Sequence, residues 1–357
     1  MIAKSDKILL ASLEERWKGY RAQLKLCRHE FSEEAVHDLR VAARRLLAVL
    51  DIVRALDPRP NVQKARKDLK SRLDSFDDLR DVQVMLVDAI ESMETLPQLK
   101  PFITQLRKRE KILLRVARKQ TKISHPSELS KRINKIHSVM ENFSQDDEFN
   151  TLLLEVVDQA FMKAAQAYSQ VDAAQPATIH SLRIAFKKFR YMVEILHPLL
   201  PSYPNDLLDC MHDYQSRMGD IQDVDVFLNT LAEFSESNAS SFDSEPVRRY
   251  FEGRRAELIA NYLELKDELN TFWRHAPEQP FPWEKNHDPV YHPSRNRRGS
   301  GNARLRRRQP APADPKGTQE DAQDSQRLEG TGGENRSDPD QPLSSSNTDD
   351  GSPGENI

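Results

Sequence analysis

The chain has 357 residues, of which 38% are hydrophobic and 31% are charged, so it is long enough for one large domain or two of ordinary size. No stretch approaches eighteen uninterrupted apolar residues, which excludes a transmembrane helix. Its two cysteines, Cys27 and Cys210, are too few for a disulfide framework or a cysteine-rich zinc site, and they fit a reducing, cytoplasmic compartment. The eleven glycines form no glycine-rich phosphate loop, and a body rich in Leu, Ala, Glu, Lys and Arg favours helices.

The net charge of −3 conceals a strong segregation of charge along the chain. Residues 295–316 hold eight basic side chains and one acid, whereas residues 317–357 hold ten acids and two arginines. Residues 107–122 hold eight basic side chains and a single acid, Glu110. Such blocks indicate more about binding partners than the total charge does.

Helical periodicity begins at the N-terminus and continues to about residue 284. The second predicted helix begins after Ser32, a suitable N-cap, and ends before Pro58. Further helices are predicted over about 61–92, 101–122 and 125–142. The first predicted helix carries its apolar residues on one face: Leu9, Leu13, Trp17, Tyr20 and Leu24.

A second helical series starts near residue 152, and one of its helices has Pro176 at the first position. Two more helices are predicted over about 205–234 and 246–274. Residues 285–357 lack the apolar content needed to fold, so we expect a disordered tail. The first helix of this series opens with the apolar residues Leu152, Leu153, Val156, Phe161 and Ala164.

The two series form an internal repeat. The segment HDLRVAARRL at 37–46 matches HSLRIAFKKF at 180–189, which lies 143 positions later. RDVQV at 80–84 matches QDVDV at 222–226, at an offset of 142. Two ordered matches at nearly one offset indicate two similar helical halves related by a pseudo-twofold axis. The predicted organisation is a first subdomain over 1–145, a second over 146–284 and a tail over 285–357.

Each repeat carries a charged stripe along one helix. His37, Arg40 and Arg44 share a face in the first half, with Arg45 beside them. Each stripe is displaced by one residue, about 100°, from the apolar stripe of its helix, so the cations flank the buried seam. Two such edges facing each other would form a positive groove. In the second half the stripe contains His180, Arg183, Lys187, Arg190 and Glu194, with Lys188 beside it.

Arginine offers a planar donor fork suited to phosphate oxygens, lysine a compact charge, and histidine a donor that becomes cationic near pH 6.5. A further one-sided basic stripe lies on the helix predicted over 101–122, and its length suits an extended polyanion. Its members are Arg107, Lys111, Arg115, Arg118 and Lys122. The second half offers Arg248, Arg249, Arg254 and Arg255 in a comparable place.

The repeated motif His-x-x-Arg-(Val/Ile)-Ala-x-(Arg/Lys)-(Arg/Lys), followed by Asp-Val-x-Val, resembles the CHAD family, the conserved-histidine α-helical domain, over about residues 5–275. The resemblance implies an all-α fold of two four-helix subdomains around a basic central groove. It also implies non-enzymatic binding of inorganic polyphosphate, with no catalytic residue, metal or cofactor. The binding residues it implies are His37, Arg40, Arg44, Arg45, His180, Arg183, Lys187, Lys188 and Arg190.

The first half departs from the family pattern, because Leu47 and Ala48 stand where the second half has Arg190 and Tyr191. One half is therefore expected to hold phosphate less tightly. As secondary basic lining of the groove we predict Arg107, Lys111, Arg115, Arg118, Arg248, Arg249 and Arg255, although a long charged helix is also compatible with a merely solvated face.

Alternatives remain for the acids, the tail and the function. Asp81 and Asp223 would fit a metal pair, but we favour pairing with arginines that they orient. The basic segment at 295–308 would fit RNA, an anionic surface or more polyphosphate, or it is a solvated linker. The leading hypothesis is a polyphosphate-binding module recruited to polyphosphate granules.

A second hypothesis is an enzyme or accessory subunit of triphosphate or polyphosphate metabolism. Relatives of the CHAD domain are often joined to a triphosphate-tunnel domain with a Glu-x-Glu-x-Lys strand, and no such strand is present in this sequence. A third hypothesis is a helical nucleic-acid-binding protein. It is disfavoured because only 7% of residues are aromatic and none interleaves with the basic stripe at 107–122.

Overall fold

A computed structural model of the chain describes residues 5–123, 126–142, 147–200, 202–204, 206–238 and 242–285. Across these ranges the chain is helical and contains no strand beyond one isolated bridge, which confirms the all-α expectation. Beyond Lys285, the predicted disordered tail lies outside the described residues. The α-helices are α1 (Ser5–His29), α2 (Glu33–Leu56), α3 (Pro60–Asp74), α4 (Asp77–Glu91), α5 (Lys100–Ile123), α6 (Ser127–Met140), α7 (Asp147–Ser169), α8 (Pro176–Leu196), α9 (Leu207–Ser237), α10 (Glu245–Leu265) and α11 (Pro282–Lys285). Short 3₁₀ helices are η1 (Pro97–Leu99), η2 (His197–Leu199) and η3 (Lys266–Thr271).

Local sequence signals set the start of the two helices that carry the repeated motif. The hydroxyl of Ser32 accepts a hydrogen bond from the backbone N–H of Ala35 at 3.1 Å, so the predicted N-cap of α2 is confirmed. Glu33 and Glu34 follow in the first turn, where the helix dipole favours negative charge. The second motif helix, α8, begins at Pro176 as predicted.

The single helix predicted over 61–92 is wrong, because the chain breaks near Ser75 into α3 and α4. The Arg40 guanidinium fills the break: it donates to the carbonyl oxygen of Leu73 at 3.3 Å and pairs with Asp77 at 2.9 Å. The break therefore satisfies a carbonyl at the end of α3 and places a carboxylate in the first turn of α4, where a helix dipole favours it. In the second half, α9 runs unbroken through the equivalent positions.

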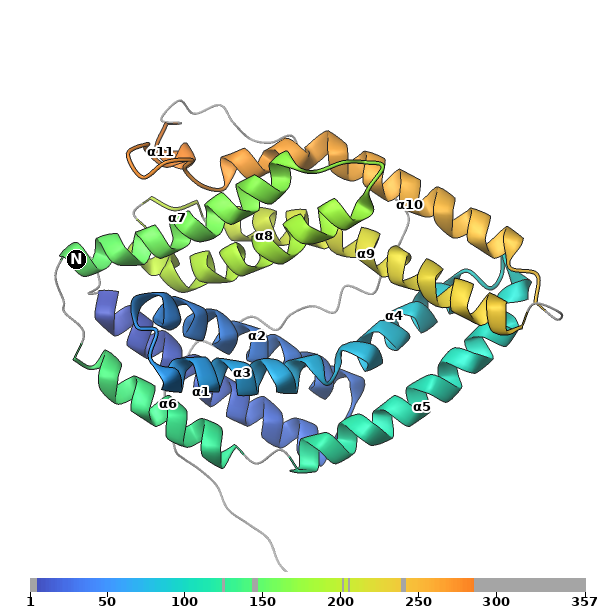
Figure 1. Cartoon of the computed structure of the whole chain (residues 1–357), viewed down its shortest axis with the longest axis horizontal. Coiled ribbons are helices and arrows are strands. Elements are labelled where there is room, and N and C mark those ends of the chain that lie inside the picture. The colour runs from blue at the N-terminus through green and yellow to red at the C-terminus, as the bar shows by residue number, and fades with distance from the viewer. Residues whose placement is uncertain are drawn as a thin grey trace, which may run out of the picture. The chain divides into compact units, whose positions relative to one another are not determined.

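Two hydrophobic cores hold the described residues together, and each draws on both halves of the repeat. The larger core joins α1, α2, α3 and α6 to α7, α8 and the beginning of α9. The smaller core joins α4 and α5 to α9 and α10, where Phe102 packs edge-on against Phe227. Figure 1 shows α4 and α5 meeting α9 and α10 at one end, with α2 beside α8 further along. The described residues therefore form one compact unit, and a boundary at residue 145 stays a prediction.

The apolar face predicted for the first helix, Trp17 included, is buried in α1, and the apolar face of α8 and Trp273 are buried as well. On α7, Leu152 is 43% exposed, because it lies one residue, about 100°, from the buried row that contains Phe149, Leu153 and Val157. Cys27 is buried as expected, whereas Cys210 is only half-buried. Among the described helices, none combines the length and apolar character that crossing a bilayer requires.

Candidate functional site

Five cations from both halves come together where α2, α4 and α8 approach one another. Two of them, Arg40 and Arg44, lie on α2. Lys187 of α8 lies close to both of them: burial, followed by the positive charges of Arg44, Arg183 and Arg40, lowers the pKa of Lys187 to about 7. The motif helices of the two repeats thus place their stripes against each other. We call this set the central basic cluster; its members are Arg40, Arg44, Arg80, Arg183 and Lys187.

The central basic cluster has an excess of positive charge. Burial is the main cause that lowers the pKa of Arg40, Arg44 and Arg183. The charges of Asp77 and Asp223 oppose the shifts in part, and neighbouring guanidinium groups add to them. Within the part of the chain that the structure describes, no hydrogen bond or ion pair engages the side chains of Arg44, Arg183 or Lys187, and the buried Nε of Arg183 has no acceptor. An anion placed among them would satisfy these donors and reverse the pKa shifts.

Arg80, which the sequence analysis did not select, ties the two halves together across the cluster. Its Nη1 and Nη2 donate to the two carboxylate oxygens of Asp223 at 2.7 and 3.0 Å, and Nη1 also lies 3.4 Å from Asp81. Asp223 is buried, so the bidentate pair is partly removed from solvent. The expectation that Asp81 and Asp223 pair with an arginine is confirmed. No group of three or more potential metal-ligating side chains occurs among the described residues.

The repeated arginines Arg40 and Arg183 are equivalent in sequence but not in charge environment. Arg40 is buried and pairs with Asp77. The position equivalent to Asp77, at the offset of 142, is Gly219. A Cβ at Gly219 would lie only 3.5 Å from the Nε of Arg183, so the arginine packs directly over the glycine. The second half therefore presents a guanidinium that lacks the carboxylate found in the first half.

The two motif histidines also differ. His37 is exposed on the first turns of α2. His180 is half-buried, and burial together with the charges of Arg183 and Lys187 lowers its pKa, while a polar contact with Gln222 opposes the shift. His180 is therefore the neutral member of a cationic neighbourhood and would gain from a nearby anion.

Lys188, which was expected in the same groove, faces a second group of charges instead. Its pKa is lowered by burial and by Arg54 and Arg66, while Asp51 opposes the shift. Asp51 itself accepts a hydrogen bond from the Nε of Arg66 and lies 3.5 Å from Arg54. We call this set the lateral cluster: Asp51, Arg54, Arg66 and Lys188, contributed by α2, α3 and α8.

Arg190 lies on the predicted stripe, but its donors are used within its own half. Its Nη1 pairs with Glu194 at 2.7 Å and its Nε donates to Gln215 at 3.1 Å. The guanidinium also lies 4.7 Å from the ring centre of Tyr191. Glu194 therefore fixes the position of the Arg190 guanidinium. Arg45 remains half-buried on α2 with its Nε unpartnered among the described residues.

The predicted secondary lining divides into two kinds of surface. On α10, Arg248 pairs with Glu245 and Glu252, and Arg255 pairs with Asp225, so these positive charges are compensated locally. Arg249 likewise pairs with Glu245. On α5, Arg107, Lys111, Arg115 and Arg118 are exposed, and none is among the principal charges that shift the central basic cluster.

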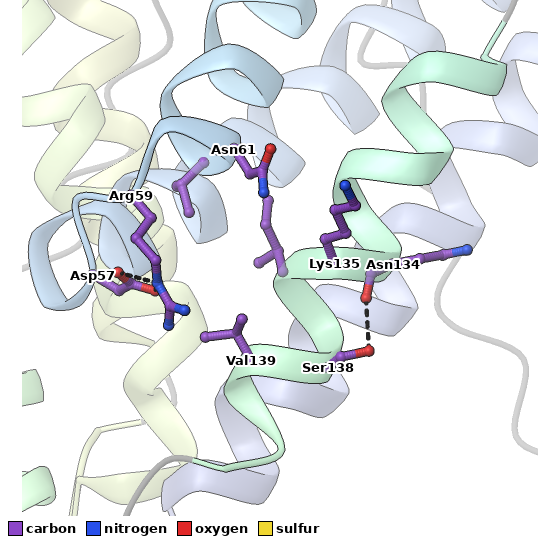
Figure 2. Close-up of a pocket in the computed structure, with 9 residues that line it drawn as sticks. Asp57, Arg59, Asn61, Asn134, Lys135, Ser138 and Val139 are labelled. Carbon is purple, nitrogen blue, oxygen red and sulfur yellow. Dashed lines mark hydrogen bonds and ion pairs between the residues drawn. The ribbon is translucent and has the colours of Figure 1, made fainter.

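Neither of two cavities that the described residues of the first half enclose contains the converging cations of both repeats. The larger, about 380 Å³, lies where the start of α3 meets α6. Figure 2 shows Arg59 at its edge, already paired with Asp57 at 2.7 Å, and Val139 on the opposite wall. The other, about 310 Å³, reaches Arg40 and Arg72 of the first half but no cation of α8. We locate the candidate site by charge and not by cavity volume, because a chain-like anion can lie along an open surface.

The structure therefore defines an all-α protein built from two motif-bearing halves, with cations of both gathered between them. A model of the CHAD domain matches residues 11–232, which is more than half of the chain. The chain belongs to the CHAD domain family.

Two solved structures show the same fold at low sequence identity. The CHAD domain from the plant Ricinus communis is 17% identical, with a TM-score of 0.56 over 76% of this chain and 90% of that one. PptA from Streptomyces chartreusis is 16% identical, with a TM-score of 0.54 over 75% of this chain and 98% of that one. No curated protein matches the sequence.

Proposed function

We propose that this protein binds inorganic polyphosphate in the central basic cluster and carries out no catalysis there. The observation that carries the proposal is the convergence of Arg44 from α2 with Arg183 and Lys187 from α8, none of them paired with a carboxylate in the described structure. Asp77 and Asp223 compensate these charges only in part. Burying such cations costs free energy, which an anionic ligand would offset. Membership of the CHAD family supports the same ligand.

An extended chain of phosphates suits this arrangement better than a single phosphate does. Arginine forks contact adjacent oxygens of one phosphate, while lysine adds a point charge. The lateral cluster adds Arg54, Arg66 and Lys188 near Asp51, which lies seven residues, about 10 Å, beyond Arg44 along α2. A linear polyanion would reach both clusters at once.

Direct titration of the purified full chain with long-chain polyphosphate tests the proposal, with pyrophosphate, ATP and RNA of matched charge as comparison ligands. We expect long-chain polyphosphate to bind most tightly, and log K to fall linearly with log salt concentration as counterions are released. Tighter binding of RNA, or an affinity that does not respond to salt, would contradict it.

The absence of catalysis is tested in the same samples by measuring phosphate release with added magnesium. We expect polyphosphate length to remain unchanged, and progressive shortening would assign an enzymatic role instead. We further propose that binding recruits the protein to polyphosphate granules in the cytoplasm. A fluorescent fusion should accumulate at granules, and an Arg44→Gln, Arg183→Gln variant should lose that accumulation.

A further inference from the structure

The exposed side of α5 carries a row of aliphatic side chains that no other helix covers in the described structure. Ile112, Val116 and Ile123 are 59%, 45% and 66% exposed. They lie four and eleven residues apart, a spacing that keeps them on one face. A neighbouring face of α5, centred about 120° around the helix, supplies buried core residues, among them Leu106 and Ala117. The helix therefore has one apolar side in the core and a second, narrower apolar row in solvent.

Positive charge that no acid pairs with in the described structure lies beside this row, mostly on the side away from the core. The one acid of the segment, Glu110, is half-buried and accepts a hydrogen bond from Gln83 of α4 at 3.4 Å. Within the described ranges no ion pair engages the basic side chains of α5, in contrast to the paired arginines of α10. Eight basic residues are exposed here: Arg107, Lys108, Arg109, Lys111, Arg115, Arg118, Lys119 and Lys122.

We propose that this face of α5 docks on an anionic phospholipid bilayer. The basic side chains would contact the phosphate and carboxylate groups of the headgroups, and the aliphatic row would enter the interface between headgroups and acyl chains. Charge complementarity requires an anionic partner, and the exposed aliphatic row requires one that also offers apolar material. A bilayer surface supplies both along the whole helix, which is about 36 Å long.

Other polyanions fit the same face less well. Polyphosphate has no apolar part, so it leaves Ile112, Val116 and Ile123 in water. Single-stranded nucleic acids combine phosphate contacts with stacking of bases on aromatic rings, and the one aromatic residue of α5, Phe102, is buried. A duplex presents phosphates, which leave the aliphatic row in water. Figure 1 shows α5 along one margin of the described helices, a position in which a plane could approach it.

Co-sedimentation of the full chain with vesicles tests the proposal. The vesicles contain phosphatidylcholine alone or with about 30% phosphatidylserine, a composition that mimics an anionic leaflet. We expect binding to the anionic vesicles only. An Ile112→Gln, Val116→Gln, Ile123→Gln variant should need about tenfold more lipid for half-maximal binding. An Arg115→Gln, Lys119→Gln variant should bind anionic vesicles less tightly, and its affinity should depend less on salt concentration.

Matched controls separate this surface from general effects. Leu152→Gln with Met162→Gln replaces two aliphatic side chains of similar exposure on α7, and Lys64→Gln with Lys67→Gln removes two exposed cations from α3. Both should bind vesicles as the unaltered chain does. The α5 aliphatic variant should retain its helical circular dichroism and its polyphosphate affinity, since neither depends on the outer face of α5.

The proposal is overturned if the unaltered chain fails to bind anionic vesicles. It is also overturned if the aliphatic variant binds them as tightly as the unaltered chain, because charge alone would then account for the interaction. Stronger capture of RNA than of vesicles, lost in the α5 basic variant but not in the aliphatic one, would assign the surface to nucleic acid instead. Vesicle binding without polyphosphate binding would support this inference while contradicting the proposed function.

Discussion

Replacing Lys187 by arginine should remove a pH dependence that the unaltered site possesses. The ammonium group of Lys187 faces Arg40 and Arg44 across from α2 and Arg183 on its own helix, while Asp77 supplies a weaker opposing charge. Burial and these cations lower its pKa from 10.5 to about 7. Arginine keeps the positive charge but does not titrate in this range.

The sign and size of the effect follow from proton linkage. A bound polyanion raises the pKa of Lys187, so binding takes up nearly one proton at pH values between the free pKa of about 7 and the bound pKa. Affinity should therefore fall by up to about tenfold per pH unit across that window. Below about pH 7 the lysine is charged in both states and contributes no slope. In the free protein the unfolded state binds more protons across this window, so stability should rise with pH.

Isothermal titration calorimetry with long-chain polyphosphate, in two buffers of different ionisation enthalpy, measures both the affinity and the number of protons taken up. The unaltered chain should take up close to one proton at about pH 8, and the Lys187→Arg variant close to none. Long chains keep the contribution of titrating end groups small, and the comparison with the variant removes it. Equal slopes for the two proteins would refute the reasoning.

The remaining predictions concern the same cluster. Arg44→Gln with Arg183→Gln should cost about 1.5–3 kcal/mol of binding free energy per residue in calorimetry, while thermal unfolding shows unchanged or greater stability because charge repulsion is relieved. Gly219→Asp should weaken polyphosphate binding, because it places a carboxylate beside Arg183. Gly219→Ala should leave binding intact and raise the unfolding free energy by about 0.5–1 kcal/mol. Equal polyphosphate affinities of the Asp and Ala variants would contradict the charge argument. Asp223→Asn should lower the unfolding free energy in urea by about 1–3 kcal/mol, since it removes the carboxylate that joins the halves; no loss would mean the pair is dispensable. His180→Gln should abolish any strengthening of polyphosphate binding below about pH 6.5, because the pKa of His180 in the free protein lies below its usual value. If the variant still binds more tightly at low pH, a group other than His180 causes the strengthening.

Much of the architecture could be predicted from the sequence, because the apolar periodicity indicates the helices and the repeat indicates two similar halves. Burial of the apolar face of α8 and capping by Ser32 depend on local spacing, which a sequence displays. The break near Ser75 does not, because the apolar period continues through it and the stabilising contact comes from Arg40, more than thirty residues away. Contacts between residues so far apart in the sequence cannot be inferred from the residues around the break.

The site was predictable in its motif positions but not in its pairings. The repeat located Arg40 and Arg183, but their charge environments differ because Asp77 lies beside one and Gly219 beside the other. Only the contacts of α2 with α4 and of α8 with α9 reveal this contrast. Arg80 was overlooked because the second repeat block has glutamine at the matching position. Its role depends on a partner in the other half, 143 residues away.

The central claim is that one polyanion is held by both halves of the repeat. A crystal structure of the protein with a polyphosphate chain tests it most directly. The account predicts a continuous chain of phosphates between α2 and α8, with oxygens within hydrogen-bonding distance of both Arg44 and Arg183. A chain bound to one half alone, or along α5 with the central basic cluster unchanged, would contradict it.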